Sequence, residues 1–227
     1  MQNVDINLDL AVERTLGLRW IVSEDAYTFK VSLTEKPSTR RGVLSTASSL
    51  YDPLGFVAPV TLLPKLVLQK FEGKWDDPIT DAENKQWTKW KTQLQSLENL
   101  RIPRCYFAQE CTAPDMHVFS DASELAYGAV IYLRSSTPEP QVAFVIGKSR
   151  VAPKKTVSIP RLELNAAAIA CKLADMVQVQ LRVKPASITY WTDSMAILRF
   201  IKNTKSRFKV FVANRLSIIH ECTIPSQ

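Results

Sequence analysis

The chain is poor in the residues that build zinc sites and disulfide frameworks. Its 227 residues include four cysteines without any Cys-x-x-Cys pair, and only two histidines, His117 and His220. Zinc ligands and disulfide frameworks need characteristic cysteine and histidine spacings. We therefore expect reduced, partly buried thiols in an intracellular protein. The cysteines are Cys105, Cys111, Cys171 and Cys222.

Long apolar runs are also missing. The longest, such as residues 142–146 and 166–171, fall far short of the roughly 20 residues that cross a bilayer. The first ten residues carry two aspartates and lack the basic-then-apolar order of a secretory signal. With 46% hydrophobic and 22% charged residues, the composition is that of a globular protein without a membrane partner.

Acidic residues are scarce in the second half of the chain. Residues 1–115 carry 14 basic and 15 acidic residues, a net charge of −1, whereas residues 116–227 carry 15 and 7, a net charge of +8. So basic a segment predicts a polyanionic partner, with phosphate groups as the leading candidate. Three of those seven acids lie where an apolar strand ends or a helix begins: Asp121, Glu163 and Asp193.

A polar, proline-flanked stretch at residues 105–115 indicates a boundary between two domains or subdomains. The first part is expected to be mainly helical with one β-hairpin. The expected elements are strands at 15–20 and 27–33, helices at 39–49 and 60–71, and a helix opened by a Thr80-x-x-Glu83 capping box. Trp87 and Trp90 recur on that last helix. They suit base stacking or a helix core, and the amphipathic spacing favours the core.

The second part predicts an α/β fold with a mixed sheet and the sequence order β-β-β-α-β-α-α. The expected strands are 116–120, 126–133, 141–146 and 187–192, with a long helix opened by Pro160 and helices at 195–202 and 208–220. If the first strand lies beside the fourth, Asp121 and Asp193 end at one sheet edge, and Glu163 lies over them in the first turn of the long helix. Separations of 42 and 30 residues mean that only the fold can join these acids. Because carboxylate oxygens suit hard cations such as Mg²⁺, we predict a catalytic metal cluster.

Several motifs resemble one family. Ser120-Asp121-Ala122-Ser123, Ser158 followed by Glu163-Leu164-x-Ala166, and Thr192-Asp193-Ser194 resemble the ribonuclease H domain of retroelement polyproteins. Together with Leu16-Gly17-Leu18-Arg19-Trp20 and a block ending in Tyr51-Asp52-Pro53-Leu54-Gly55, the chain resembles the pol polyprotein of BEL/Pao retrotransposons over nearly its whole length. The resemblance implies that residues 1–110 are the thumb and connection end of a reverse transcriptase. Residues 111–227 would be a ribonuclease H-like domain truncated at its C-terminal end.

The resemblance also implies an activity, the hydrolysis of the RNA strand of RNA·DNA hybrids. Asp121, Glu163 and Asp193 would hold two Mg²⁺ ions, or Mn²⁺ in their place, of which one activates water and the other stabilises the leaving oxygen. No small-molecule cofactor is implied. The partners would be the hybrid and the remainder of the polyprotein, in the cytoplasm, a virus-like particle or the nucleus.

Basic residues are expected to contact the phosphates of the hybrid, so binding should weaken as salt rises. Each is equally well explained as a solvated surface charge, and no residue is identified that reads the 2′-hydroxyl. The candidates are Lys148, Arg150, Lys154, Lys155, Arg161, Lys202, Lys205, Arg207 and Lys209.

Two departures from the family lower the expected activity. A fourth acidic residue of the family site would follow residue 227, and the polymerase signature Tyr-x-Asp-Asp is absent. We therefore expect a fragment with weak or no activity by itself, or a decayed retroelement copy.

Other chemistries fit these motifs less well. Taken singly, each acid suits a turn cap or a helix N-terminus. An aspartic peptidase needs two Asp-Thr/Ser-Gly turns and a serine hydrolase needs Gly-x-Ser-x-Gly, and the chain has neither. The alternative that stays open is a non-catalytic, connection-like module that binds nucleic acid.

Overall fold

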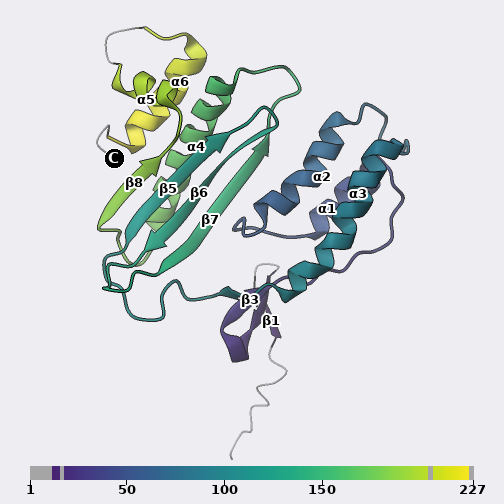
Figure 1. Ribbon diagram of the computed structural model, residues 1–227, viewed down its shortest axis with the longest axis horizontal. Coiled ribbons are helices and arrows are strands. Elements are labelled where there is room, and N and C mark those ends of the chain that lie inside the picture. The colour runs from purple at the N-terminus through teal and green to yellow at the C-terminus, as the bar shows by residue number, and fades with distance from the viewer. Residues whose placement is uncertain (1–11, 16–17, 204–206, 225–227) are drawn as a thin grey trace, which may run out of the picture. The chain divides into compact units, whose positions relative to one another are not determined.

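The computed structural model describes residues 12–15, 18–203 and 207–224 (Figure 1). The chain divides into two compact units, the first made of residues 1–53 and 59–105, the second of residues 54–58 and 106–227. The assignment of residues 1–110 to a reverse transcriptase thumb and connection stays a prediction. Among the helices that the structure describes, none combines the length and hydrophobicity needed to span a membrane.

The first unit contains a small antiparallel sheet. Its strands, in spatial order, are β1 (Val12–Thr15), β2 (Leu18–Ile21), β3 (Ala26–Thr28) and β4 (Ile102–Pro103). The expected hairpin is formed by β2 and β3, and Asp25 closes its turn with a φ of 45°. β3 ends at Thr28, whereas the expected strand ends at residue 33. Its neighbour β4 has only two residues that can pair with it. Leu16 and Gly17 of the sequence motif lie outside the described residues.

Three α-helices follow the hairpin in the first unit. They are α1 (Arg40–Ser49), α2 (Ala58–Lys70) and α3 (Asp81–Leu94), and the 3-10 turn η3 (Gln95–Asn99) continues α3. α1 begins after Thr39, whose hydroxyl accepts a hydrogen bond from the Gly42 amide. α3 begins at the predicted capping box, in which Thr80 and Glu83 satisfy each other's amides.

The two tryptophans of α3 lie in the core of the first unit. Trp87 and Trp90 are 2% and 4% exposed, and their rings stack with centroids 4.8 Å apart. The Trp90 indole donates a 2.8 Å hydrogen bond to the Val60 carbonyl. Pro64, four residues after Val60 in α2, has no amide hydrogen for that carbonyl. The core interpretation is therefore confirmed, and the indole compensates for a proline inside a helix.

The second unit contains a mixed sheet in the order β7-β6-β5-β8 (Figure 1). β5 pairs in parallel with β8, and the other pairs are antiparallel. The chain order β-β-β-α-β-α-α is as predicted. The elements are β5 (Asp115–Ala122), β6 (Ala126–Arg134), β7 (Val142–Val151), α4 (Ile159–Gln180), β8 (Ser187–Trp191), α5 (Met195–Lys202) and α6 (Val210–Cys222).

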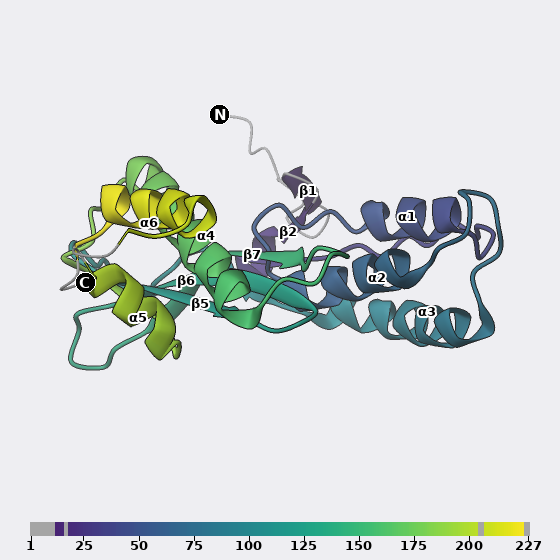
Figure 2. The ribbon, with the colours of Figure 1, turned by 90° about the horizontal axis from the view of Figure 1, so that it is seen from above.

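One face of this sheet packs against α4, and α6 lies beside α4 (Figure 2). Successive side chains of β5 point to opposite faces of the sheet, so one set is buried and the other is exposed. Met116 and Val118 are fully buried in the core with α4, whereas Phe119 on the opposite face is 40% exposed. Asp121 shares the face of Phe119 because it lies two residues further along the strand.

The segment 54–58 belongs to the second unit because it packs on β7. The Gly147 amide donates a 2.8 Å hydrogen bond to the Leu54 carbonyl, and the Phe56 ring lies 5.0 Å from the Phe144 ring. Gly55 has a φ of 79°, in the region that favours glycine. The Leu-Gly end of the Tyr-Asp-Pro-Leu-Gly block therefore attaches this segment to the sheet.

Candidate carboxylate and nucleic-acid site

The parallel pair β5 and β8 brings the two aspartates to neighbouring strand ends. Phe119 pairs with Trp191 in register, and Asp121 and Asp193 each follow two residues later. The Ser120 hydroxyl also reaches the Trp191 carbonyl at 3.5 Å. The prediction that the first strand of this unit lies beside the fourth is confirmed.

Aromatic side chains hold these two strand ends together on the open face. The rings of Phe119 and Trp191 stack at 5.9 Å with an interplanar angle of 12°. The Trp191 indole also donates a 3.2 Å hydrogen bond to Nδ1 of His117. None of these three residues was a predicted site residue, and their contacts join the strands that carry Asp121 and Asp193.

Glu163 lies slightly further into its helix than expected. α4 begins at Ile159 after the N-cap residue Ser158, and Pro160 is its second residue. The first turn therefore contains no acid, and the prediction that Glu163 lies in it is wrong. Proline fits the first turn because amides there have no intrahelical partner, so Pro160 does not mark the first helical residue. Favourable interaction with the helix dipole falls off beyond the first turn and does not explain Glu163.

Ser194 connects Glu163 to the segment that carries Asp193. The Ser194 hydroxyl donates a short hydrogen bond to Oε2 of Glu163, and Ser194 is only 7% exposed. Oγ of Ser194 also accepts a 3.4 Å hydrogen bond from the Ile197 amide, so Ser194 caps α5. One hydroxyl thus joins α4 to the residue that follows Asp193. The sequence signal was present, since a serine before an apolar helix is a typical N-cap.

The three acids match a hard cation in donor type. All offer carboxylate oxygens, the ligands that Mg²⁺ prefers. Oδ1 of Asp121 accepts a 2.7 Å hydrogen bond from the Ala122 amide, and Asp193 has no hydrogen-bond partner among the described residues. Within the described ranges, no three or more acidic, histidine or cysteine side chains are gathered closely enough to hold a metal.

The cysteines offer no competing soft-metal site. All four are free thiols, and Cys105 is exposed whereas Cys171 is buried. Burial raises the pKa of the Cys171 thiol to about 12, with a smaller contribution from nearby Cys222. A thiol with so high a pKa is a poor metal ligand and a poor nucleophile at neutral pH.

The candidate phosphate-binding residues that the structure describes are all exposed. β7 extends to Val151, five residues past its predicted end, so Lys148 and Arg150 lie in a strand. None of these residues forms an ion pair in the described part of the chain, which leaves their charges available to a polyanion. Lys154, Lys155 and Arg161 flank the start of α4, Lys202 ends α5, and Arg207 and Lys209 precede α6. Lys205 lies outside the described residues.

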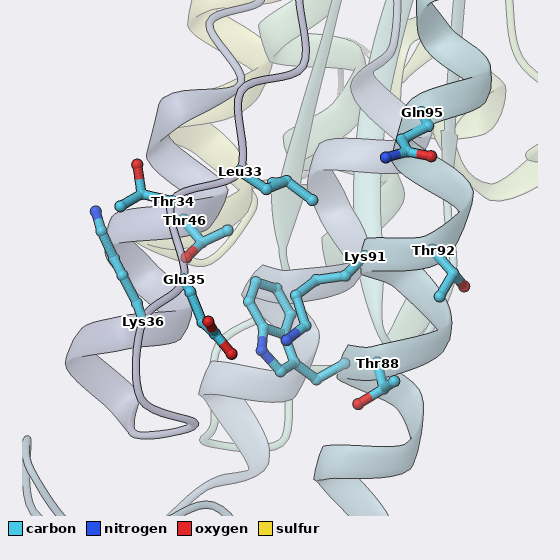
Figure 3. Close-up of a pocket in the computed structure, with 10 residues that line it drawn as sticks. Leu33, Thr34, Glu35, Lys36, Thr46, Thr88, Lys91, Thr92 and Gln95 are labelled. Carbon is cyan, nitrogen blue, oxygen red and sulfur yellow. The ribbon is translucent and has the colours of Figure 1, made fainter.

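The first unit has a pocket of its own, with a volume of about 420 Å³. Figure 3 shows the segment around Leu33 and Lys36 on one side and α3 with Lys91, followed by Gln95 of η3, on another. The Lys91 ammonium lies 5.6 Å from the Trp87 ring centroid. The pocket is lined mostly by threonine and long polar side chains. Among the described residues, no cluster of acids, histidines or cysteines lies there.

Comparison with known proteins agrees with the topology. A family model described as a Pao retrotransposon-like RNaseH-like domain matches residues 39–194. The structure of a foamy viral protease-reverse transcriptase dRH with double-stranded DNA aligns with a TM-score of 0.53 and 14% identity, over 92% of this chain and 35% of that one. The foamy viral protease-reverse transcriptase with an RNA/DNA hybrid aligns with a TM-score of 0.51 and 13% identity, over 92% and 28%.

These likenesses support the fold of the chain. No curated protein matches the sequence. This chain spans about a third of the length of the foamy viral chains, and identities of 13% and 14% carry information on the fold alone. The predicted ribonuclease H-like α/β architecture is confirmed.

Proposed function

Because the chain belongs to the Pao retrotransposon-like RNaseH-like domain family, we propose that its second unit hydrolyses the RNA strand of RNA·DNA hybrids. The observation that carries this proposal is the parallel pairing of β5 and β8, which brings Asp121 and Asp193 to adjacent strand ends. Glu163 from α4 is joined to the same segment through Ser194. One foamy viral structure of similar fold holds an RNA/DNA hybrid, which supports this choice of substrate.

The chain's own residues have distinct parts in this reaction. Asp121, Glu163 and Asp193 would bind Mg²⁺ or Mn²⁺, which when bound supplies a Lewis acid that activates water and neutralises developing charge. The Ser194 hydroxyl donates to Oε2 of Glu163, so the other carboxylate oxygen would remain to bind the metal ion. The exposed basic residues around α4 and before α6 would bind backbone phosphates and position the hybrid.

The test is cleavage of a duplex with an end-labelled RNA strand, in Mg²⁺ and separately in Mn²⁺. We expect weak cutting of the RNA strand alone, loss of cutting with EDTA, and no cutting of double-stranded DNA of the same sequence. Hybrid binding should weaken steeply between low and high salt, since it depends on phosphate contacts. Cutting of both duplexes alike, or cutting that survives EDTA, would count against this function.

A second candidate function is a non-catalytic module that binds the hybrid. The observation in its favour is that the three carboxylates are not gathered into one group in the described residues, whereas the basic residues are exposed and unpaired. Salt-sensitive binding of the hybrid without metal-dependent cutting would identify this function.

Ser194→Gly is expected to impair metal binding more than folding. Glycine is tolerated at an N-cap at a cost of only a few tenths of a kcal/mol relative to serine, but it removes the donor to Glu163. Since partners that orient metal ligands are worth about 10–100-fold in affinity or activity, we expect a loss of about tenfold in Mn²⁺ affinity, measured by calorimetry. Ser194→Thr keeps the hydroxyl and should restore affinity.

The matched control is Thr39→Gly, which removes the corresponding cap of α1 in the other unit. It should change thermal stability to a similar extent and leave Mn²⁺ affinity unchanged. Equal metal affinity in Ser194→Gly and the unaltered chain would reduce Ser194 to a helix cap.

A further inference from the structure

Two arginines share one aromatic ring where α4 meets α6. The Arg215 guanidinium carbon lies 3.9 Å from the centroid of the Phe211 ring, and that of Arg161 lies 5.3 Å from it. Because both distances end at the same centroid, the two guanidinium carbons are at most about 9 Å apart, each within cation–π range of the ring. Two groups of like charge thus contact one ring, no more than about 9 Å apart.

Arg215 is fixed in this position by hydrogen bonds. Its Nε donates to Oδ1 of Asn165 at 3.1 Å, and one Nη donates to the Phe211 carbonyl at 3.4 Å. A guanidinium has five N–H groups, so three remain for a ligand. Asn165 lies four residues after Arg161 on α4, on the same helical face. The partly exposed side chain of Arg215 is therefore ordered before any ligand arrives.

Arg161 makes no hydrogen bond or ion pair through its side chain within the described residues, and it is exposed. The one ion pair of the second unit in the described part of the chain joins Arg134 to Asp115. Neither cation on Phe211 thus has an acidic partner. One arginine is sufficient for a cation–π contact with the ring. The second adds electrostatic repulsion between the two guanidinium groups, which a bound anion would reduce.

We propose that Arg161, Phe211 and Arg215 form a clamp for one phosphodiester group of a nucleic-acid backbone, oriented by Asn165. Planar guanidinium groups match the oxygens of a phosphate in bidentate hydrogen bonds, and stacking on a ring prepares them for it. Exposed Lys154 and Lys155 precede α4, and Lys209 precedes α6, so the neighbouring charges suit an extended polyanion better than a single ion.

The clamp rests on the proposed function for the identity of its ligand. It extends that function by adding Arg215, Phe211 and Asn165 to the nucleic-acid site, none of which the charge pattern singled out. Arg161 and Glu163 both lie near the start of α4, but residues two apart project from different faces of a helix, so the clamp would bind the backbone without contacting the reacting atoms.

The test is binding of a fluorescent RNA·DNA hybrid by the full chain, without divalent metal, over a series of salt concentrations. Arg215→Gln should raise the Kd about tenfold, as expected for lost hydrogen bonds to a charged group. It should also reduce the slope of log Kd against log salt by about one. Phe211→Leu keeps both charges and should weaken binding because the guanidinium groups lose their support.

Arg199→Gln is the matched control, since it removes an exposed arginine of α5 that has no ring contact. It should change the Kd less than twofold. Arg215→Lys keeps the charge without the planar fork. It covers the case in which Arg215→Gln fails to fold, and it should still weaken binding severalfold.

Thermal unfolding of every variant separates packing from binding. If Arg215→Gln and Phe211→Leu lower the Tm while Kd and salt slope stay within twofold, the contact only joins α4 to α6 and the proposal is overturned. Binding of inorganic phosphate without binding of the hybrid would overturn the assignment of a phosphodiester group as the ligand. Weakened hybrid binding supports the clamp even in a chain that does not cut RNA, so the failure of catalysis and the failure of the clamp are distinguishable.

Discussion

Asp121→Asn and Asp193→Asn, each alone, are expected to lower metal-dependent cleavage of the RNA strand by at least about 100-fold. Changes to residues that only orient metal ligands already cost about 10–100-fold, and these substitutions neutralise a ligand itself. The parallel register of β5 and β8 gives both aspartates equivalent positions, so the two variants should behave alike. Initial rates of cutting of an end-labelled hybrid, in Mg²⁺ and in Mn²⁺, measure the effect.

Binding must be measured beside cutting in these variants. Removal of a negative charge near a phosphate backbone should leave hybrid affinity equal or slightly higher, whereas stabilisation of the chain by Mn²⁺ in thermal unfolding should be lost. Asp175→Asn is the matched control, because Asp175 is an exposed acid on α4 of the same unit. It should alter neither cutting nor metal stabilisation.

Cutting that persists in both aspartate variants would place the catalytic groups elsewhere or point to a contaminating nuclease. Equal losses in Asp175→Asn and in the aspartate variants would show that overall charge, and not the carboxylate site, governs the rate. Normal hybrid binding by a chain that never cuts would favour the non-catalytic module.

Local patterns predicted most of the elements from the sequence. The capping box of α3 and the apolar runs of the expected strands are signals contained within a few neighbouring residues. The adjacency of Asp121 and Asp193 also followed, because a mixed sheet with the first strand beside the fourth leaves few arrangements.

Contacts between distant side chains could not be predicted in this way. Ser194 reaches Glu163 across 31 residues, and Arg215 reaches Asn165 across 50. Periodicity tells which face of a helix is apolar, but not which polar side chain of another element faces it. The position of Glu163 within α4 was also wrongly predicted, because a proline in the first turn does not fix which residue begins the helix.

The contact of residues 54–58 with β7 could not be predicted from the sequence either. Pro53 and Gly55 are typical turn residues, and turn residues alone do not tell where a segment packs. Only the structure shows that the Leu54 carbonyl meets the Gly147 amide, more than 90 residues away. The Leu-Gly end of the family motif is therefore explained by a close backbone contact.

Gly55→Ala is expected to destabilise the second unit strongly. A Cβ at Gly55 would lie 2.0 Å from the Gly147 carbonyl oxygen, and the φ of 79° is unfavourable for alanine. Positive φ costs about 1–2 kcal/mol and overpacking against backbone typically 1–3 kcal/mol, so we expect a loss of about 3 kcal/mol and a Tm lower by roughly 10 °C. Chemical denaturation and thermal unfolding measure the change.

Gly147→Ala is the matched control on the other side of the same contact. Its Cβ would lie 3.3 Å from the Gly55 carbonyl oxygen, and its φ is not in the glycine region, so a shift of a few tenths of an ångström relieves the contact. We expect a loss of about 1 kcal/mol or less. Amide hydrogen exchange should show the larger loss of protection in β7 for Gly55→Ala. Equal losses in the two variants, or a loss confined to the helices of the first unit, would mean that the 54–58 segment does not stabilise this sheet. In that case, the glycine of the Tyr-Asp-Pro-Leu-Gly block would serve only its own turn.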